Sequence, residues 1–238
     1  VGNNALSANV SGQHNNAFGK QSLSSYTGSF ASAFGGFSLT NNTTGTGNSA
    51  FGYASVGNTT TGGNNTGVGY FAVYNNVTGS CNTALGYNSG PTVGNLSNTI
   101  AIGCNVGVAG SNRTVIGDAA MMSIGGFANW TNLSDGRFKK DVEANVPGIE
   151  FIKKLHPVTY TYDLVTYDKW RGLDETAAPD CYPSGRKAKE AIRYTGFIAQ
   201  DVEKAANELK FDFSGVDKPE NDKTAYGLRY AEFVVPLV

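Results

Sequence analysis

The sequence predicts a mainly β, multidomain protein: a β-roll or β-solenoid of about seven coils, followed by a small α+β domain that ends in a truncated C-terminal helix. Three observations support this prediction. A short phrase ending in glycine recurs through the first half of the chain. Before residue 134 there are three charged side chains, Lys20, Arg113 and Asp118, whereas the last 105 residues carry the other 34. Helix and strand patterns typical of a globular domain begin at about residue 146. We therefore expect a repeat domain over 1–126, a linker or cap over 127–133 and a second domain over 134–238.

The repeat is read from its phrase glycines, which are spaced 16, 17, 17, 17, 17 and 14 residues apart. The phrases are Asn16-Ala17-Phe18-Gly19, Ser32-Ala33-Phe34-Gly35, Ser49-Ala50-Phe51-Gly52, Thr66-Gly67-Val68-Gly69, Thr83-Ala84-Leu85-Gly86, Ile100-Ala101-Ile102-Gly103 and Thr114-Val115-Ile116-Gly117. A period of this length holds two extended segments and two turns, which is one solenoid coil, and it is too short for a pair of helices. Disordered low-complexity sequence is the alternative, but disorder has no reason to keep a period through seven phrases.

Each coil is expected to place one large apolar side chain inward, with glycine at a tight corner and Asn, Ser and Thr at the turns. One coil cannot bury its apolar side alone, so stability would come from stacking. With roughly two large apolar residues per coil, a single solenoid is short of buried surface. Three chains packed about an axis would supply the missing burial, which predicts a homotrimer.

After the repeat, Phe127 and Trp130 fit two interpretations. They either form an apolar plug that closes the end of the solenoid or anchor a linker.

The last hundred residues predict short alternating elements. We expect a helix over 147–155 with Ile149, Ile152 and Leu155 on one stripe, a strand over 158–163, an elaborated loop over 164–190 and a strand over 194–199. A helix over 201–209, a strand over 225–230 and the start of a further helix at 231 follow. The chain is expected to stop inside this last element.

The composition excludes several classes of function. With 18 basic and 19 acidic residues, nothing indicates nucleic-acid binding or an anionic membrane surface, and no apolar run is long enough for membrane insertion. Cys81, Cys104 and Cys181 are far apart without metal-ligand spacing, so we expect buried, small apolar roles for them. His14 and His156 are expected to be structural. We predict no metal and no cofactor.

The repeat phrases resemble the β-roll head repeats of trimeric bacterial surface adhesins, whose left-handed coils carry Asn-Ser-x-Ala-x-Gly phrases. The resemblance covers roughly residues 3–120. The coil here is longer than that family's usual coil, except between Gly103 and Gly117, which implies larger loops as candidate contact surfaces.

The C-terminal part resembles the endosialidase-type intramolecular chaperone domain of phage tail fibres and tailspikes, a self-cleaving peptidase domain. Four phrases in order carry the resemblance: Ser134-Asp135-Gly136-Arg137-Phe138-Lys139, Leu155-His156-Pro157-Val158-Thr159-Tyr160, Gly196-Phe197-Ile198-Ala199-Gln200-Asp201-Val202-Glu203 and Tyr226-Gly227-Leu228-Arg229-Tyr230-Ala231-Glu232-Phe233. The resemblance implies a homotrimer whose C-terminal domain registers three chains, assists folding and is then cut off at Leu133–Ser134. Ser134 would be the nucleophile and Lys139 the base.

The chemistry of such a dyad constrains its geometry. A serine hydroxyl is a poor nucleophile until a base takes its proton, and a lysine does so only when burial or cationic neighbours lower its pKa from about 10.4. The cationic neighbours of Lys139 in the sequence are Arg137 and Lys140. Positions five apart on a helix point about 140° away from each other, so Ser134 must lie in a loop before the helix, or Lys139 must act across a chain boundary. The alternative is that Ser-Asp-Gly is a turn and helix cap beside a solvated basic face.

The sequence therefore predicts a segment of a trimeric fibre or adhesin for attachment to a cell surface, with a C-terminal intramolecular chaperone that drives trimerisation and is a candidate Ser-Lys endopeptidase acting once on its own chain. The alternative is a structural trimerisation cap without cleavage or receptor role. The expected location is extracellular, on a phage tail fibre, a related injection-apparatus fibre or a bacterial surface, joined to a larger fibre before residue 1. Candidate contacts to a receptor or glycan are Tyr53, Tyr70, Phe71, Tyr74 and Tyr87. Core or interchain packing is the favoured alternative for these residues. A polysaccharide-degrading activity is disfavoured, because residues 1–130 offer Asp118 alone where glycoside hydrolysis needs a carboxylate pair.

Overall fold

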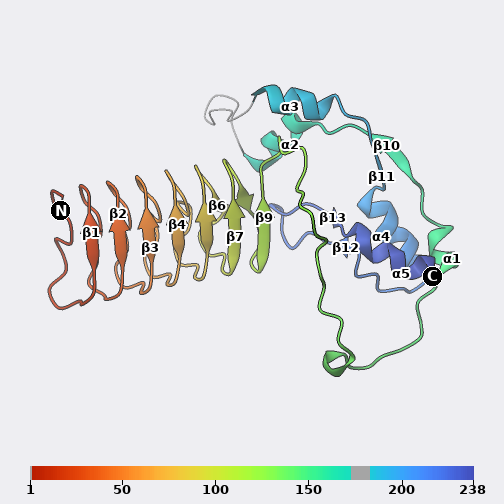
Figure 1. Ribbon diagram of the computed structural model, residues 1–238, viewed down its shortest axis with the longest axis horizontal. Coiled ribbons are helices and arrows are strands. Elements are labelled where there is room, and N and C mark those ends of the chain that lie inside the picture. Colours follow the sequence, from red (N-terminus) through yellow and green to blue (C-terminus); the bar gives the residue numbers. More distant parts are fainter. Residues whose placement is uncertain (1, 173–182) are drawn as a thin grey trace. The chain divides into compact units, whose positions relative to one another are not determined.

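The computed structural model describes residues 2–172 and 183–238 (Figure 1). Its fold confirms the predicted class, because it is mainly β, with a β-solenoid of about six turns, a small α/β region and a short C-terminal helix. Two compact units divide the chain. One comprises Val1–Met121 with Gly172–Arg186, and the other comprises Met122–Arg171 with Lys187–Val238.

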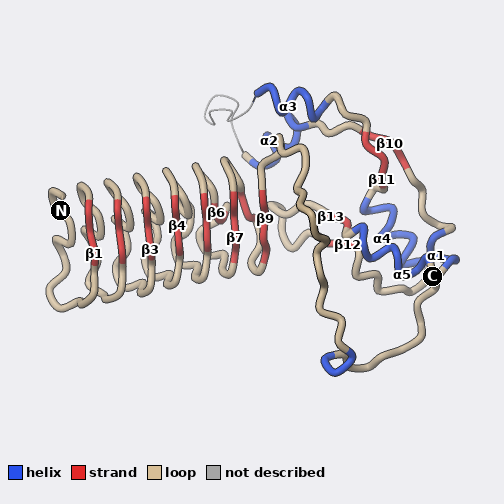
Figure 2. The backbone as a smooth tube through the Cα atoms, viewed as in Figure 1, coloured by secondary structure: helices blue, strands red, loops and turns tan. Residues whose placement is uncertain are grey.

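In the solenoid, each repeat phrase forms one short strand of a single parallel sheet (Figure 2). The strands, in spatial order, are β1 (Asn16–Phe18), β2 (Ser32–Phe34), β3 (Ser49–Phe51), β4 (Thr66–Val68), β5 (Thr83–Leu85), β7 (Thr99–Ile102) and β9 (Arg113–Ile116). Equivalent phrase residues pair in register, for example Ala33 with Ala50 and Phe34 with Phe51. A second, two-stranded parallel sheet pairs β6 (Gly90–Pro91) with β8 (Gly107–Val108). The repeat period therefore equals one turn of the chain around the solenoid.

The side-chain direction within the phrase corrects the sequence prediction. The small middle residue faces inward, as Ala33 and Ala50 are fully buried, whereas the large residue that follows it faces outward. Successive side chains on a strand point to opposite faces, so only one of the two can enter the coil. The lumen of so short a coil accepts the methyl group of alanine at this position.

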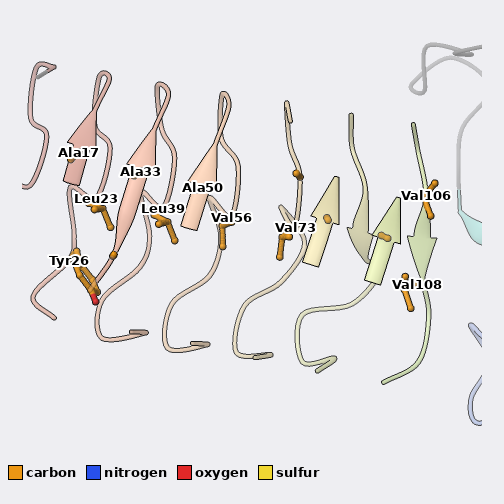
Figure 3. Packing of buried hydrophobic residues seen from close by; sticks show 14 residues of the cluster. Ala17, Leu23, Tyr26, Ala33, Leu39, Ala50, Val56, Val73, Val106 and Val108 are labelled. Carbon is orange, nitrogen blue, oxygen red and sulfur yellow. The ribbon is translucent and has the colours of Figure 1, made fainter. Parts of the chain in front are cut away.

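The larger core residues come from the segment after each phrase glycine (Figure 3). They are fully or almost fully buried and comprise Leu23, Leu39, Val56, Val73, Val106 and Val108. Four of them, Leu23, Leu39, Val56 and Val73, have φ between 52° and 55°. A positive φ is costly for a β-branched residue such as valine. Burial of the side chain in the stack therefore compensates for a strained corner.

The phrase glycines form a row along which neighbouring coils touch. Gly52 has a φ of 129°, and a Cβ added there would lie 2.5 Å from the carbonyl oxygen of Gly69 in the next coil. Both the backbone conformation and the close approach require glycine.

Buried asparagines tie the coils together from within. The backbone N–H of Asn65 donates to Asn48 Oδ1 (2.8 Å), and that of Asn82 donates to Asn65 Oδ1 (3.0 Å). Each amide nitrogen also donates to a carbonyl oxygen of a turn, as Asn65 Nδ2 does to Gly79 (3.0 Å). This asparagine ladder, Asn48, Asn65 and Asn82, ends at Thr99, whose N–H and hydroxyl both donate to Asn82 Oδ1. Buried backbone donors that strands leave unpaired are thus satisfied.

One coil replaces the ladder by an aromatic residue. The position equivalent to Asn48 is Ala31, in the 16-residue period between Gly19 and Gly35. In the same period Tyr26 is fully buried, and its hydroxyl donates to the carbonyl oxygen of Ser29. The tyrosine ring therefore supplies volume where the side chain of the ladder residue is shortened to alanine.

The second unit contains short helices and two antiparallel strand pairs. In chain order, its elements and those at its boundary are η1 (Gly136–Phe138), α1 (Ile149–Ile152), β10 (Val158–Tyr160), α2 (Leu164–Arg171), α3 (Pro183–Glu190), β11 (Tyr194–Gly196), α4 (Ala199–Glu208), β12 (Val216–Asp217), β13 (Gly227–Leu228), η2 (Tyr230–Phe233) and α5 (Val234–Leu237). Strand β10 pairs with β11, and β12 pairs with β13. The predicted loop over 164–190 is wrong where it is described, because it contains α2 and α3. Asp163 caps α2 by accepting from the N–H of Thr166 (2.8 Å).

The core of this unit lies around α1 and α4. Its buried residues are Phe151, Val202, Ala205, Ala206, Phe213 and Phe233. The predicted stripe on α1 is partly wrong, because Phe151 is the buried residue of that helix and Ile149 is exposed. Helix α1 has one turn, so its rotation follows the aromatic contacts of Phe151 with Phe211 and Phe213. No helix among the described residues is long and apolar enough to span a bilayer.

Candidate functional site

The predicted dyad residues are in direct contact. Lys139 Nζ donates a hydrogen bond to Ser134 Oγ over 2.8 Å. Ser134 lies in the loop before η1, and Lys139 follows the last residue of that helix. Of the two geometries that the sequence allows, the structure therefore has the serine in the loop, with both groups on one chain.

A turn built by Asp135 brings the two ends of this motif together. Asp135 is the N-cap of η1, and its Oδ1 accepts from the backbone N–H of Arg137 (2.9 Å). The N–H of Lys139 donates to the carbonyl oxygen of Gly136 (3.2 Å). These two bonds reverse the chain within five residues, so that a side chain after the turn reaches one before it.

The same carboxylate binds the guanidinium of Arg137. Nε of Arg137 lies 3.1 Å and 3.0 Å from the two carboxylate oxygens, and Nη2 lies 2.6 Å from Oδ2. The hydrogen bonds from Arg137 lower the pKa of Asp135, and Asp135 raises the pKa of Arg137. The guanidinium of Arg137 therefore forms an ion pair with the carboxylate of Asp135. The guanidinium also lies over the ring of Phe138.

The bond preceding the serine is accessible. Every residue from Met121 to Val146 is exposed except Asp135, which is half-buried. Leu133 is 82% exposed. The carbonyl group of Leu133 thus belongs to an extended segment without secondary structure, next to a hydroxyl that a lysine contacts.

The apolar residues of this segment are exposed. Phe127 is fully exposed and Trp130 is 85% exposed. Whether they close the end of the solenoid or anchor a linker stays a prediction. Large apolar side chains in water are costly, so they are candidates for contact with other chains.

The aromatic residues predicted as receptor contacts lie together on the solenoid. The rings of Tyr53, Tyr70 and Tyr87 are stacked from coil to coil, with centroids 5.3 Å and 5.6 Å apart and interplanar angles of 14°. We call these three residues the tyrosine row. Phe71 packs edge-on to Tyr70 and lies against Tyr74. The ring faces between neighbouring coils are thus covered by other rings, and the row presents ring edges and hydroxyl groups to solvent.

The cysteines differ from their expected roles. Cys81 is free and exposed, and Cys104 is disulfide-bonded, so neither is simply a buried small residue. Cys181 lies outside the described residues. His14 stacks on Phe30, with ring centroids 5.2 Å apart. Among residues 2–172 and 183–238, no cluster of three or more His, Cys, Asp or Glu side chains is arranged to hold a metal ion.

Sequence reasoning paired Ser134 with Lys139 but did not assign a separate role to Asp135. The signal was present, because Ser-Asp-Gly is a turn and cap phrase. From the sequence, a turn and cap was the alternative to a catalytic role for this phrase. In the structure, the cap formed by Asp135 belongs to the turn that brings Lys139 to Ser134.

Comparison with known proteins finds a similarity for the C-terminal region. Residues 134–210, about a third of the chain, match the family model described as chaperone of endosialidase. The match begins at Ser134 and confirms the predicted resemblance to this family. It includes the first three of the four phrases, and the fourth, over 226–233, lies beyond it. No match was found among curated proteins or among solved structures.

Proposed function

We propose that the chain is a segment of a homotrimeric extracellular fibre, in which residues from Ser134 onward are an intramolecular chaperone that assembles three chains and then cuts the Leu133–Ser134 bond. The observation that carries the proposal is the 2.8 Å contact between Lys139 Nζ and Ser134 Oγ at the first residue of the chaperone match. The fibre is a phage tail fibre, a related injection-apparatus fibre or a surface adhesin, joined to a larger fibre before residue 1.

The cutting step begins at the serine hydroxyl. Lys139 acts as the general base and takes the proton of Ser134 Oγ while this oxygen attacks the carbonyl carbon of Leu133. The C–N bond breaks, the lysine gives the proton to the nitrogen of Ser134, and an ester joins the Leu133 carbonyl to Oγ. Water then hydrolyses this ester, which releases the Leu133 carboxylate and restores the serine hydroxyl on a new N-terminus. Each molecule reacts once, because the reaction breaks the one peptide bond that precedes Ser134.

Chain length after expression tests this step. Denaturing electrophoresis and mass spectrometry of the freshly expressed full chain should show a C-terminal fragment that begins at Ser134. Ser134→Ala and Lys139→Met should leave one uncut band, while Lys140→Met, which changes the neighbouring exposed lysine, should still cut. An uncut wild-type chain would favour the alternative, a trimerisation cap without cleavage.

The trimer has its own support. The chaperone of endosialidase match and the low apolar content of each coil both favour assembly of three chains. Light scattering of the Ser134→Ala chain, which cannot cut itself, should give about 75 kDa, three times the mass of the 25.0 kDa chain. A mass of one chain would overturn the trimer and leave the cleavage proposal to its own test.

We also propose that the solenoid attaches to a cell surface. The exposed edges and hydroxyl groups of the tyrosine row support it, with Phe71 and Tyr74 beside them. Because the faces between the rings are covered, a glycan would bind through hydroxyl groups and ring edges. A glycan array probed with the trimer, and with Tyr70→Ala as the comparison, tests this contact. Equal binding by both proteins would place the receptor site elsewhere.

A further inference from the structure

The strands of the solenoid carry an exposed line of large apolar side chains, which we call the apolar row. It contains one residue per coil in six successive coils: Phe18, Phe34, Phe51, Val68, Leu85 and Ile102. They are between 36% and 51% exposed. A sheet face that meets water normally carries polar residues at its outward positions. Six apolar residues in line, with no polar or charged interruption, indicate a face that is covered.

The apolar row is ordered within one chain. The rings of Phe18, Phe34 and Phe51 are stacked, with both centroid distances 5.0 Å and interplanar angles of 9° and 2°. Their edges therefore form a regular ridge whose repeat is the strand spacing of the solenoid. In the last three coils the ridge continues with smaller aliphatic side chains.

The strand positions beside the apolar row carry no charged residue. Two residues earlier on each strand, on the same face, lie Asn16, Ser32, Ser49, Thr66, Thr83 and Ile100. Covering this face would desolvate hydroxyl and amide groups, which hydrogen-bond readily to one another, but no ionised group, which is the expensive case. The face is therefore suited to burial against a protein surface of the same kind.

The exposed apolar area of the row is comparable to that of the largest apolar patches on monomeric proteins. A large apolar side chain has about 150–200 Å² of surface, so two-fifths exposure in six residues leaves about 400 Å² per chain. That value is in the range of the largest apolar patches on monomeric proteins, which are often functional. Three copies together would remove about 1,200 Å² of apolar side-chain surface, or about 400 Å² for each pair of chains. A specific pairwise interface buries about 1,200 Å² or more in total, so the small polar residues beside the row would supply the rest of each contact.

We propose that the apolar row is the contact surface between copies of this chain, with the rows of three solenoids packed side by side along a common axis. The inference rests on the proposed trimer and specifies which face of the solenoid is inside it. A second copy is the occupant that fits, because it has the same axial repeat and the same side chain in every coil. A partner without this periodicity could match one or two coils but not six. The tyrosine row then lies at the rim of the contact, with its hydroxyl groups in water.

Charge substitutions on two faces of the solenoid test this assignment in the Ser134→Ala chain. Phe51→Glu would place three carboxylates near the common axis, so its trimer should melt at a lower temperature than the parent trimer and dissociate more readily to the 25.0 kDa chain on dilution. The matched control is Val77→Glu, which makes a similar change at an exposed apolar residue outside the apolar row, and its trimer should be as stable as the parent. A Phe51→Glu trimer as stable as the parent would overturn the inference while leaving the trimer intact.

Cross-linking gives a result that does not depend on loss of assembly. In a Cys81→Ser background, which removes the exposed free thiol, Phe34→Cys should form disulfide-linked dimers on mild oxidation. Tyr70→Cys, on the tyrosine row, should cross-link much less. The reverse pattern would assign the interface to the tyrosine row and refute our assignment. A monomeric parent chain would refute the proposed trimer itself, and the inference with it.

Discussion

The carboxylate of Asp135 holds Arg137 at two places, with the backbone N–H at 2.9 Å and the guanidinium Nη2 at 2.6 Å. This double contact closes the turn that returns Lys139 to Ser134. The dyad therefore depends on a third residue that does not touch the hydroxyl group. Asp135 is a positioning residue in the proposed reaction.

Asp135→Ala should slow the appearance of the fragment beginning at Ser134 by roughly fivefold, because it removes the N-cap that closes the turn. Asp135→Asn keeps an oxygen that can accept from the Arg137 N–H but loses the ion pair, so its rate should lie between those of alanine and wild type. The measurement is a time course on denaturing gels. A purely electrostatic role would instead make the two variants equally slow, and rates equal to wild type in both would remove Asp135 from the site.

Gly52→Ala should destabilise the solenoid by roughly 2 kcal/mol or more, because an alanine there combines a positive φ with a clash against the next coil. The control is Gly36→Ala. A Cβ at Gly36 would lie 3.5 Å from its nearest neighbour, Tyr53, which is ordinary contact. Urea unfolding followed by circular dichroism compares the two. Similar losses of stability would show that the glycine row has no special steric role.

Asn65→Ala should cost roughly 2 kcal/mol, because it leaves the buried N–H of Asn82 without its partner and removes one of the two donors to the carbonyl oxygen of Gly79. The exposed Asn41 pairs with Asn58 at the surface, and Asn41→Ala should change stability by no more than about 0.5 kcal/mol. If thermal unfolding showed equal effects, the asparagine ladder would not be what links the coils.

The second unit should lose local stability in acid through Glu203. Hydrogen bonds from Lys218 and Tyr226 lower the pKa of Glu203. The contribution is therefore present above the unfolded pKa of about 4.5 and is lost as pH falls through the lower folded value. Hydrogen exchange of the α4 amides should accelerate in wild type between pH 5 and pH 3, after correction for intrinsic exchange rates, by more than in Glu203→Gln. The effect is modest because the Lys218 side chain of the pair is 56% exposed, so solvent screens the interaction. Glu150→Gln is the control, and identical pH profiles for Glu203→Gln and wild type would contradict the prediction.

The repeat could be predicted from sequence because the glycine spacing records the coil directly. The inward residue could not, because a three-residue strand has too few positions to show which face is polar. Alanine and phenylalanine are both apolar, and the choice between Ala50 and Phe51 depends on the width of the lumen, which only the folded coil defines. For the same reason, the sequence did not predict that the large residues of the phrases form an exposed apolar row.

Strands β10, β11 and β13 and helix α4 follow from local patterns, whereas β12, α2 and α3 were missed. Pro179, Pro183 and Gly185 favoured a loop, although Pro183 begins α3, where its missing N–H costs nothing. For the dyad, residue types and helix geometry predicted a serine before the turn. The role of Asp135 required the actual hydrogen bonds, because a cap phrase is common and its effect depends on where the turn directs the next side chains.

The in-register stacking of the coils gives the protein a natural unit of length. Each 17-residue period adds one strand, which extends the sheet by about 4.8 Å, and each period repeats the same small core, glycine corner and outward apolar residue. Inserting or deleting a whole period would shift every later side chain along the axis without rotating it around the solenoid. A fibre built in this way can change its reach in fixed steps while the faces it shows to partners stay in line.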